Sequence, residues 1–277
     1  MSAEIYYFSG TGNTLFVAKD IASGLSARLI PIAALEDRES VKIEADVIGI
    51  VYPVYYGELP LMVKRFAGML ENVRGKYIFA IATFGGSPGT SIGLLGNIIK
   101  SKGGELGAAF GVHMPQNAFL KPWETNEATL IAWKKKAGRL LKNICNGKRN
   151  SYPNAVMKAV IFVFHNAFKP LYKKSFIKYS GASPDLPLDD LIRLTDRSYR
   201  ANSRCTGCGI CAKVCPCRNI EIKDGKPVWQ SRCETCLACY NWCPERTIEG
   251  GVAKKNYYYK NSHIALFEMT GQKEFTV

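Results

Sequence analysis

The sequence lacks any apolar stretch that could cross a membrane. Its longest uninterrupted apolar run is AVIFVF at residues 159–164, whereas a membrane helix needs roughly 20 apolar residues. The first residues, MSAEIYYFSG, contain no basic stretch followed by an apolar segment and a small-residue cleavage site, so nothing indicates secretion. We therefore expect a soluble, cytoplasmic protein.

Cysteine is almost absent from the first 200 residues, where only Cys145 occurs. The other nine of the ten cysteines lie within residues 205–243. Disulfides are rare in a reducing cytoplasm, and a cysteine cluster there is typical of metal or redox chemistry. The distribution therefore predicts a metal-binding module in the C-terminal part of the chain.

Strand-like and helix-like patterns alternate from the N-terminus to about residue 147. Apolar runs that read as strands occupy residues 3–8, 27–32, 45–53, 76–84 and 106–114. Amphipathic stretches that read as helices run from about Thr14 to Gly24, Pro60 to Leu70, Ile92 to Ser101 and Asn126 to Cys145. Such alternation predicts an α/β fold in which helices cover both faces of a parallel sheet. With 277 residues, the chain is long enough for a second domain.

Residues 155–180 form an apolar, aromatic segment with five lysines and no acidic residue. Pro170 is expected to break this segment, and SGASPDLPLDD at residues 180–190 reads as a linker. Two interpretations stay open. The segment is either a helical connector packed between two domains or a basic amphipathic helix on a membrane surface.

Two cysteine runs repeat one spacing. The first is CTGCGICAKVCP at residues 205–216, and the second is CETCLACYNWCP at residues 233–244. Both read C-x2-C-x2-C-x3-C-P, and the same offset of 28 residues relates Arg218 to Arg246 and Ile220 to Ile248, which indicates an internal repeat. In this spacing three thiolates bind one cubane cluster and the fourth binds the other cluster. Zinc held by paired CxxC elements would require neither the third cysteine nor the double C-x3-C-P ending.

The spacing assigns the ligands of two [4Fe-4S] clusters. One cluster is assigned to Cys205, Cys208, Cys211 and Cys243, and the other to Cys233, Cys236, Cys239 and Cys215. Residues 221–230, EIKDGKPVWQ, predict a hairpin with its turn at Asp224-Gly225. This region resembles the bacterial-type two-cluster ferredoxins. Cys217 is an alternative to Cys215 as the fourth ligand of the second cluster, and the repeat favours Cys215. Cys217 and Cys145 are expected to be ordinary buried thiols.

The residues FSGTGNT at positions 8–14 lie between the first strand and the first helix. Free backbone amides and hydroxyls at a helix N-terminus favour a bound phosphate. A dinucleotide fingerprint would need glycine at position 15, which is Leu15, and a Walker loop would need a lysine, which does not occur before Lys19. The remaining pattern, S-x-T-G-x-T, resembles the phosphate loop of flavodoxins. That resemblance implies an FMN phosphate held by Ser9, Gly10, Thr11, Gly12, Asn13 and Thr14.

Two further loops follow predicted strands, at the edge of the sheet where flavin binds in such folds. They are YPVYYGELP at residues 52–60 and TFGGSPGT at residues 83–90. The resemblance implies that Tyr55 or Tyr56 stacks on the flavin ring near Pro53 and that Gly57 supplies a flexible peptide near N5; core packing is the alternative for the tyrosines. It also implies that the ring edge is approached by Thr83, Phe84, Gly85 and Gly86.

A third element, HMPQNAF at residues 113–119, resembles a M-P-x-N-[YF] element that lines the flavin site of flavodoxin-ferredoxin fusions. We expect His113, one of three histidines, to be structural rather than a proton donor.

From end to end, the chain resembles the flavodoxin-ferredoxin fusion proteins of anaerobes. This implies a flavodoxin-like, doubly wound five-stranded sheet of order 2-1-3-4-5 in residues 1–148 and a helical connector in residues 149–198. A small α+β two-cluster ferredoxin domain in residues 199–250 and a C-terminal tail in residues 251–277 would follow.

The implied function is electron transfer between the two [4Fe-4S] clusters and FMN, because covalent linkage keeps the modules at high local concentration. The alternative is a ferredoxin-dependent flavin reductase acting on a quinone or another small oxidant. Neither an NAD(P) fingerprint nor a catalytic dyad is recognised, so whether the protein is an enzyme stays open.

The formal charge of +14 raises nucleic acid as a partner. Two oxidised clusters with their thiolates would contribute about −4 and a flavin phosphate about −2, which leaves about +8. We expect an acidic redox protein as the partner, such as a ferredoxin, a flavodoxin or an oxidoreductase, and no nucleic acid.

Overall fold

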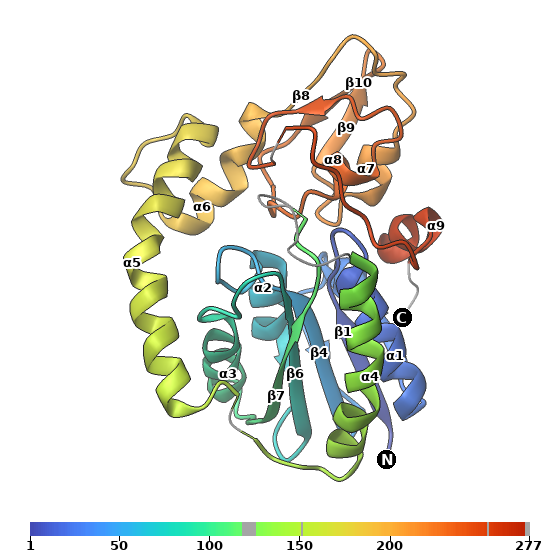
Figure 1. Cartoon of the computed structure of the whole chain (residues 1–277), viewed down its shortest axis with the longest axis vertical. Helices are drawn as coiled ribbons and strands as arrows, with labels where there is room; N and C mark the ends of the chain where they lie inside the picture. The colour runs from blue at the N-terminus through green and yellow to red at the C-terminus, as the bar shows by residue number, and fades with distance from the viewer. Residues whose placement is uncertain (118–125, 151, 254, 275–277) are drawn as a thin grey trace.

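The computed structural model describes residues 1–117, 126–150, 152–253 and 255–274, and a five-stranded parallel sheet forms the centre of its N-terminal half (Figure 1). The strands are β1 (Ala3–Tyr7), β2 (Arg28–Pro31), β4 (Val47–Pro53), β6 (Tyr77–Phe84) and β7 (Leu106–His113), in the order β2-β1-β4-β6-β7. Counted among themselves they stand in the order 2-1-3-4-5, which is that of the flavodoxin-like doubly wound fold. The predicted α/β class and strand order are therefore confirmed. A separate parallel pair joins β3 (Val41–Lys42) to β5 (Leu70–Glu71).

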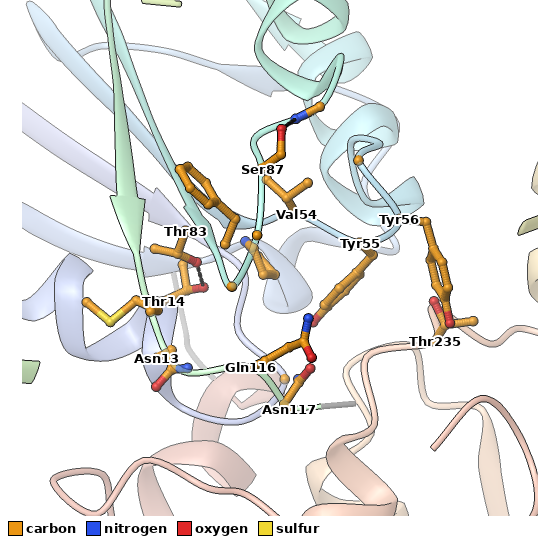
Figure 2. A pocket seen from close by; sticks show the side chains of 18 of the residues that line it. Asn13, Thr14, Val54, Tyr55, Tyr56, Thr83, Ser87, Gln116, Asn117 and Thr235 are labelled. Carbon is orange, nitrogen blue, oxygen red and sulfur yellow. Dashed lines mark hydrogen bonds between the residues drawn. The ribbon is translucent and has the colours of Figure 1, made fainter. Parts of the chain in front are cut away.

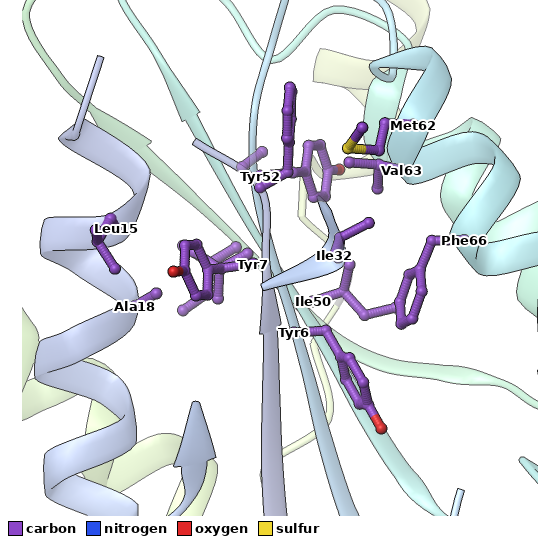
Figure 3. Packing of buried hydrophobic residues seen from close by; sticks show 14 of the residues in the cluster. Tyr6, Tyr7, Leu15, Ala18, Ile32, Ile50, Tyr52, Met62, Val63 and Phe66 are labelled. Carbon is purple, nitrogen blue, oxygen red and sulfur yellow. The ribbon is translucent and has the colours of Figure 1, made fainter. Parts of the chain in front are cut away.

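Helices cover both faces of this sheet, because successive residues of a strand point to opposite faces. Figure 3 shows Tyr7 facing α1 (Asn13–Leu25) and Tyr6 facing α2 (Leu61–Met69), where its ring centroid lies 4.8 Å from that of Phe66. The short 3-10 helix η1 (Ile32–Leu35) follows β2, and α3 (Ser91–Ser101) follows β6. The layers bury Ile48, Ile50 and Ile78 completely.

The helix α4 (Asn126–Cys145) has the predicted bounds and is amphipathic, as predicted. The apolar positions Leu130, Trp133, Ala137, Leu140 and Ile144 are buried, and the basic positions Lys134, Lys135, Arg139 and Lys142 are exposed. Cys145 lies one position beyond Ile144, off the buried stripe, and is exposed. The prediction of a buried thiol is therefore wrong for Cys145.

A single long helix, α5 (Ala155–Ser180), runs along the edge of the molecule (Figure 1). It continues through Pro170, so the prediction that this proline breaks the segment is wrong. Pro170 cannot donate to the carbonyl of Asn166, but both residues are exposed, where water can satisfy that carbonyl. None of the helices in the described part of the chain is long and apolar enough to cross a membrane.

The predicted linker is shorter than expected, because a new helix begins within it. Gly181, with φ of +62°, ends α5, and α6 (Leu188–Arg193) starts before residue 190. The 3-10 helix η2 (Leu194–Ser198) follows and leads into the cysteine-rich part.

The cysteine-rich part repeats its backbone at the same offset of 28 residues as its sequence. The helix α7 (Ile210–Val214) corresponds to α8 (Ala238–Trp242). The positive φ angles of Gly207, Gly209 and Arg218 return at Thr235, Leu237 and Arg246. Because non-glycine residues seldom adopt positive φ, this match indicates one backbone fold used twice.

Two antiparallel strand pairs complete the cysteine-rich part. The strands β9 (Ile220–Lys223) and β10 (Lys226–Trp229) pair around Asp224 and Gly225, which both have positive φ, so the predicted hairpin is confirmed. The strand β8 (Arg200–Ala201) pairs with β11 (Ile248–Glu249).

The C-terminal residues return to the N-terminal half. The backbone amide of Asn261 donates to the carbonyl of Thr11 over 2.9 Å. Lys19 of α1 forms a 2.6 Å ion pair with Glu268 of α9 (Leu266–Thr270), which is followed by the 3-10 helix η3 (Gly271–Lys273). The segment expected as a tail therefore supports the loop that follows β1.

Candidate functional site

Residues 9–14 connect β1 to α1, and all six are buried. Gly12 is the N-cap residue of α1 with φ of +96°, and among the described residues no side chain caps this helix end. The first amides of α1 are therefore available to an anion. The Oγ of Ser9 accepts a hydrogen bond from the amide of Gly12 over 3.2 Å, which closes the loop on itself.

A cavity of about 650 Å³ lies at the carboxyl ends of the strands (Figure 2), within the size range of about 300–1,000 Å³ that is typical of ligand pockets. It brings together three predicted loops. Of the predicted cofactor-binding residues, those that line it are Ser9, Gly10, Thr11, Asn13, Thr14, Pro53, Tyr55, Tyr56, Gly57, Thr83, Phe84, Gly85 and Gly86. The Oγ1 atoms of Thr14 and Thr83 are 2.8 Å apart and join two of these loops. Gly12 is the one predicted residue that does not line the cavity.

Tyr55 and Tyr56 leave the loop after β4 in different directions (Figure 2). The ring of Tyr55 meets Phe8 edge-on at 6.2 Å, and its hydroxyl lies beside Gly10. Tyr56 has φ of +55°, and its ring packs edge-on against Phe176 of α5 at 4.6 Å. Tyr55 is therefore the tyrosine on the side of the 9–14 loop, whereas Tyr56 anchors the loop to α5.

Asn13 makes contacts that the sequence did not predict. Its Nδ2 donates to the carbonyl of Pro115 over 2.9 Å. Its Oδ1 accepts from the hydroxyl of Tyr259 over 2.6 Å and from Nδ2 of Asn261 over 3.0 Å. The Asn13 side chain thus holds the C-terminal segment against the loop. Only the backbone amide of Asn13 is then left to bind a phosphate.

The third predicted element contributes its middle residues to the cavity. Met114, Pro115, Gln116 and Asn117 line it, whereas residues 118 and 119 of this element lie outside the described residues. The side chain of His113 is exposed, does not line the cavity, and places Nε2 3.1 Å from the carbonyl of Gly85.

The helix α5 supplies one wall of the cavity, which the sequence did not predict. The residues of α5 that line the cavity are Val160, Ile161, Phe164, His165, Phe168 and Tyr172. Their spacing places them on one face of a helix, which is a readable signal. The sequence gives no indication of which element that face would meet.

At this wall the buried His165 pairs with the half-buried Glu58. The Nε2 of His165 lies 2.8 Å from Oε1 of Glu58, and their side chains are 6% and 18% exposed. Lys169 approaches the same carboxylate oxygen at 3.6 Å. A Cβ added to Gly57 would lie 2.8 Å from Nδ1 of His165, so position 57 requires glycine. The carbonyl of Gly57 also accepts from the amide of Thr90 over 2.8 Å.

The cysteines of the first predicted set lie around one small cavity. Cys205, Cys208, Cys211 and Cys243 all line it, although they come from both cysteine runs. Burial, together with the neighbouring groups of Cys243, Cys208 and Cys205, raises the pKa of Cys211 to about 11. In the part of the chain that the structure describes, no group of three or more His, Cys, Asp or Glu side chains could hold a metal ion as it stands.

The cysteines of the second predicted set also interact with one another. Burial raises the pKa of Cys239, and so do the charges of Cys236, Cys215 and Cys233. Burial likewise raises the pKa of Cys233 to about 12. These raised values keep the thiols protonated at neutral pH unless a positive charge binds them.

Several cysteine sulfurs accept hydrogen bonds from backbone amides. The amide of Asn219 donates to Sγ of Cys215 over 3.4 Å, and the amide of Thr247 donates to Sγ of Cys243 over 3.5 Å. These two bonds are again related by the offset of 28 residues. Cys217 is buried, as predicted. Its hydrogen bond to Cys215 lowers the pKa of Cys215.

The cavity and the second cysteine set adjoin each other. Thr235, which lies between Cys233 and Cys236, lines the cavity (Figure 2). A Cβ added to Gly10 would lie 2.5 Å from the carbonyl oxygen of Cys236 and 3.0 Å from its Cβ. The Nε1 of Trp242 donates to the carbonyl of Gly10 over 3.2 Å. The residues predicted to bind phosphate and the residues predicted to bind iron are therefore in contact.

The solved structures that are similar to this protein match about half of the chain. No protein-family model and no curated protein matches the sequence. Similar solved structures include flavodoxin 2 of Bacillus cereus (19% identity, 50% of this chain and 99% of that chain, TM-score 0.37). The two-electron-reduced flavodoxin of Megasphaera elsdenii is 22% identical and covers 47% of this chain and 98% of its own, with a TM-score of 0.32. An archaeal flavodoxin is 19% identical and covers 52% of this chain and 99% of its own, with a TM-score of 0.34. Similarities this weak add nothing about function, and the flavodoxin-like fold assigned above depends on the strand order.

Proposed function

We propose that this protein is an iron-sulfur flavoprotein that passes electrons between two [4Fe-4S] clusters and a bound FMN. The observation that carries the proposal is the contact between the two predicted sites. Thr235 of the second cysteine run lines the same cavity as Thr14, and Cys236 packs against Gly10. When bound, FMN exchanges one or two electrons and each cluster exchanges one.

The residues of the cavity fit FMN. The amides at the start of α1 and the hydroxyls of Ser9, Thr11 and Thr14 would hold the phosphate, because the described residues that line the cavity include no lysine or arginine. Tyr55, Phe84 and the glycines after β6 would bracket the ring. The aromatic and glycine residues that line the cavity favour a planar, largely apolar group.

The cysteines fit two cubanes better than two single metal ions. A cubane binds one thiolate at each iron, so its ligands surround a volume instead of converging on one point. The first set surrounds a cavity, and amides donate to the sulfurs of Cys215 and Cys243, as is common where thiolates bind iron. We propose the ligand sets given above, with Cys215 and not Cys217 in the second, because the backbone repeat extends to Asn219 and Thr247.

Cofactor content tests this proposal. The full chain, purified without oxygen, should contain about eight irons, about eight sulfides and one FMN per molecule. Cys211→Ala and Cys236→Ala should each lose iron, whereas Cys145→Ala, which changes an exposed cysteine outside both sets, should retain it. Zinc in place of iron, or equal loss from all three variants, would refute the cluster assignment.

A second candidate function is favoured by the wall that α5 supplies. The cavity continues past the flavin loops to Phe164 and Phe168, and the pair of His165 and Glu58 lies beside it. This arrangement suits an apolar oxidant such as a quinone, which takes up two electrons and two protons to form a hydroquinone. His165 would deliver one of these protons and solvent the other.

Turnover separates the two candidates. If the protein is a reductase, reduced wild-type protein should convert a soluble naphthoquinone to its hydroquinone repeatedly, and Phe168→Asp should raise the KM for it. If the protein is an electron carrier, quinone reduction should be slow and should not respond to Phe168→Asp.

The electron donor that we propose is an acidic redox protein that docks near the first cysteine set. Cys208 is exposed, and so are Arg204 and Lys213 nearby in the chain. A basic surface of this kind steers an acidic partner to the cluster nearest to solvent.

A further inference from the structure

The helix α5 exposes an unusual amount of apolar surface. Of the thirteen large apolar residues that are exposed in the described part of the chain, eight lie on α5. Phe162 is 61% exposed, Val163 66% and Phe164 61%. Single exposed apolar residues need no explanation, but a contiguous group of them marks an interaction site.

The exposed residues surround the N-terminal half of the helix instead of forming one stripe. At 3.6 residues per turn, Ala159 and Val163 lie on the side away from Phe164 and Phe168, which line the cavity. A helix that is apolar all round is normally enclosed by a protein core or by lipid. The inner side of α5 lines the cavity. The outer side, which contains Phe162 and Val163, is not covered by any element in the described part of the chain.

The charge of this region selects an anionic occupant. The helix has five lysines, and the sequence contains no aspartate or glutamate from Ala128 to Pro184. Lys158 is exposed in the first turns of the helix, and among the acidic groups of other elements, Glu58 pairs with Lys169. Long lysine side chains can keep their charge at a headgroup while their stems lie along apolar surface.

We propose that the outer face of α5 seats on an anionic membrane surface, with Phe162 and Val163 at the acyl boundary and the lysines at the lipid headgroups. The helix lies on the surface and does not cross the bilayer, because its five lysines make it too polar to span the hydrocarbon core although its 26 residues would be long enough. An acidic protein could also pair with the lysines. However, a groove in a protein binds one apolar face of a helix, and the apolar face on the inner side of α5 already lines the cavity.

Vesicle binding by the full chain tests this proposal without any cofactor. The protein should sediment with phosphatidylcholine vesicles that contain phosphatidylglycerol, much less with pure phosphatidylcholine, and less in high salt. The double variant Phe162→Ser/Val163→Ser should bind at least about tenfold more weakly, because two large apolar side chains no longer enter the lipid. Phe267→Ser is the matched control, since Phe267 is 74% exposed on α9 and should not affect binding.

Charge variants complete the test. Lys158→Gln should weaken binding about fivefold, whereas Lys255→Gln, an exposed lysine outside α5, should not. Both apolar sites are exposed, so unchanged unfolding free energies would verify that the double variant folds. The proposal is overturned if wild-type protein does not bind anionic vesicles or binds neutral vesicles equally well. It is also overturned if the double variant abolishes a dimer and leaves vesicle binding unchanged, because the face would then belong to a second copy.

Discussion

The carbonyl of Gly10 accepts a hydrogen bond from the indole of Trp242 over 3.2 Å. The bond is buried and links the loop after β1 to the helix of the second cysteine run, 232 residues further along the chain. Because Cys236 packs against the same glycine, the two proposed redox sites share a rigid contact.

Gly10→Ala should disrupt the contact. The new Cβ would lie 2.5 Å from the carbonyl oxygen of Cys236, which is a backbone atom that cannot rotate away. We expect the free energy of unfolding to fall by about 1–3 kcal/mol in urea denaturation. The control Gly93→Ala places its Cβ in open space on α3 and should raise the free energy of unfolding by about 0.5–1 kcal/mol. A Gly10→Ala protein as stable as the wild type would contradict the close approach.

Trp242→Phe removes the donor to Gly10 and leaves a buried carbonyl without that hydrogen bond. This should cost about 1–3 kcal/mol of unfolding free energy. Trp229→Phe is a matched control, because Nε1 of Trp229 is buried without a hydrogen-bond partner in the described part of the chain. If both substitutions had the same effect in denaturant titrations, the hydrogen bond would contribute nothing.

Asn13→Ala should loosen the C-terminal segment, because Tyr259 and Asn261 both donate to the Oδ1 of Asn13. Amide hydrogen exchange around Tyr259 should become about tenfold faster or more, as expected for the loss of buried hydrogen bonds. Asn143→Ala on α4 is the control and should leave exchange in this segment unchanged. Equal protection in the two variants would show that Asn13 does not anchor the segment.

The ion pair of Lys19 with Glu268 should make stability depend on pH. Burial alone would raise the pKa of Glu268, but the hydrogen bonds from Lys19 and from the amide of Ala265 lower it below the ordinary value of 4.5. The folded state thus favours the carboxylate, so this contribution is present above about pH 4.5 and is lost as the pH falls through the lowered pKa.

Glu268→Gln should therefore reduce the unfolding free energy at pH 7 more than at pH 3. Denaturation at both pH values checks this, with the exposed Glu105→Gln as the control. A loss of the same size at pH 3 and pH 7 would exclude the ion pair as its cause.

The sequence predicted the sheet and the loops of the cavity because their signals are local. Strand and helix periods placed β1, α1 and α4, and the glycines and hydroxyls of residues 9–14 predicted a loop that does line the cavity. The hairpin at Asp224 and Gly225 followed from turn chemistry in the same way.

What the sequence could not predict depends on contacts between distant segments. The role of Asn13 became visible only with Tyr259 and Asn261 in place. The face of α5 was readable as helical, but its position against the loops after β4 and β6 was not. The prediction that Pro170 breaks the helix was wrong, because an exposed helix tolerates the loss of the backbone hydrogen bond that proline cannot donate.

The rate of flavin reduction in oxygen-free, FMN-loaded protein tests the central claim most directly. After rapid mixing with substoichiometric dithionite, the clusters of the wild type and of Cys145→Ala should bleach first, and the flavin should follow at a rate independent of protein concentration. In Cys236→Ala, flavin reduction should be at least about tenfold slower. Flavin reduction at the same rate in all three proteins would contradict the proposal that electrons reach FMN through the cysteine-held clusters.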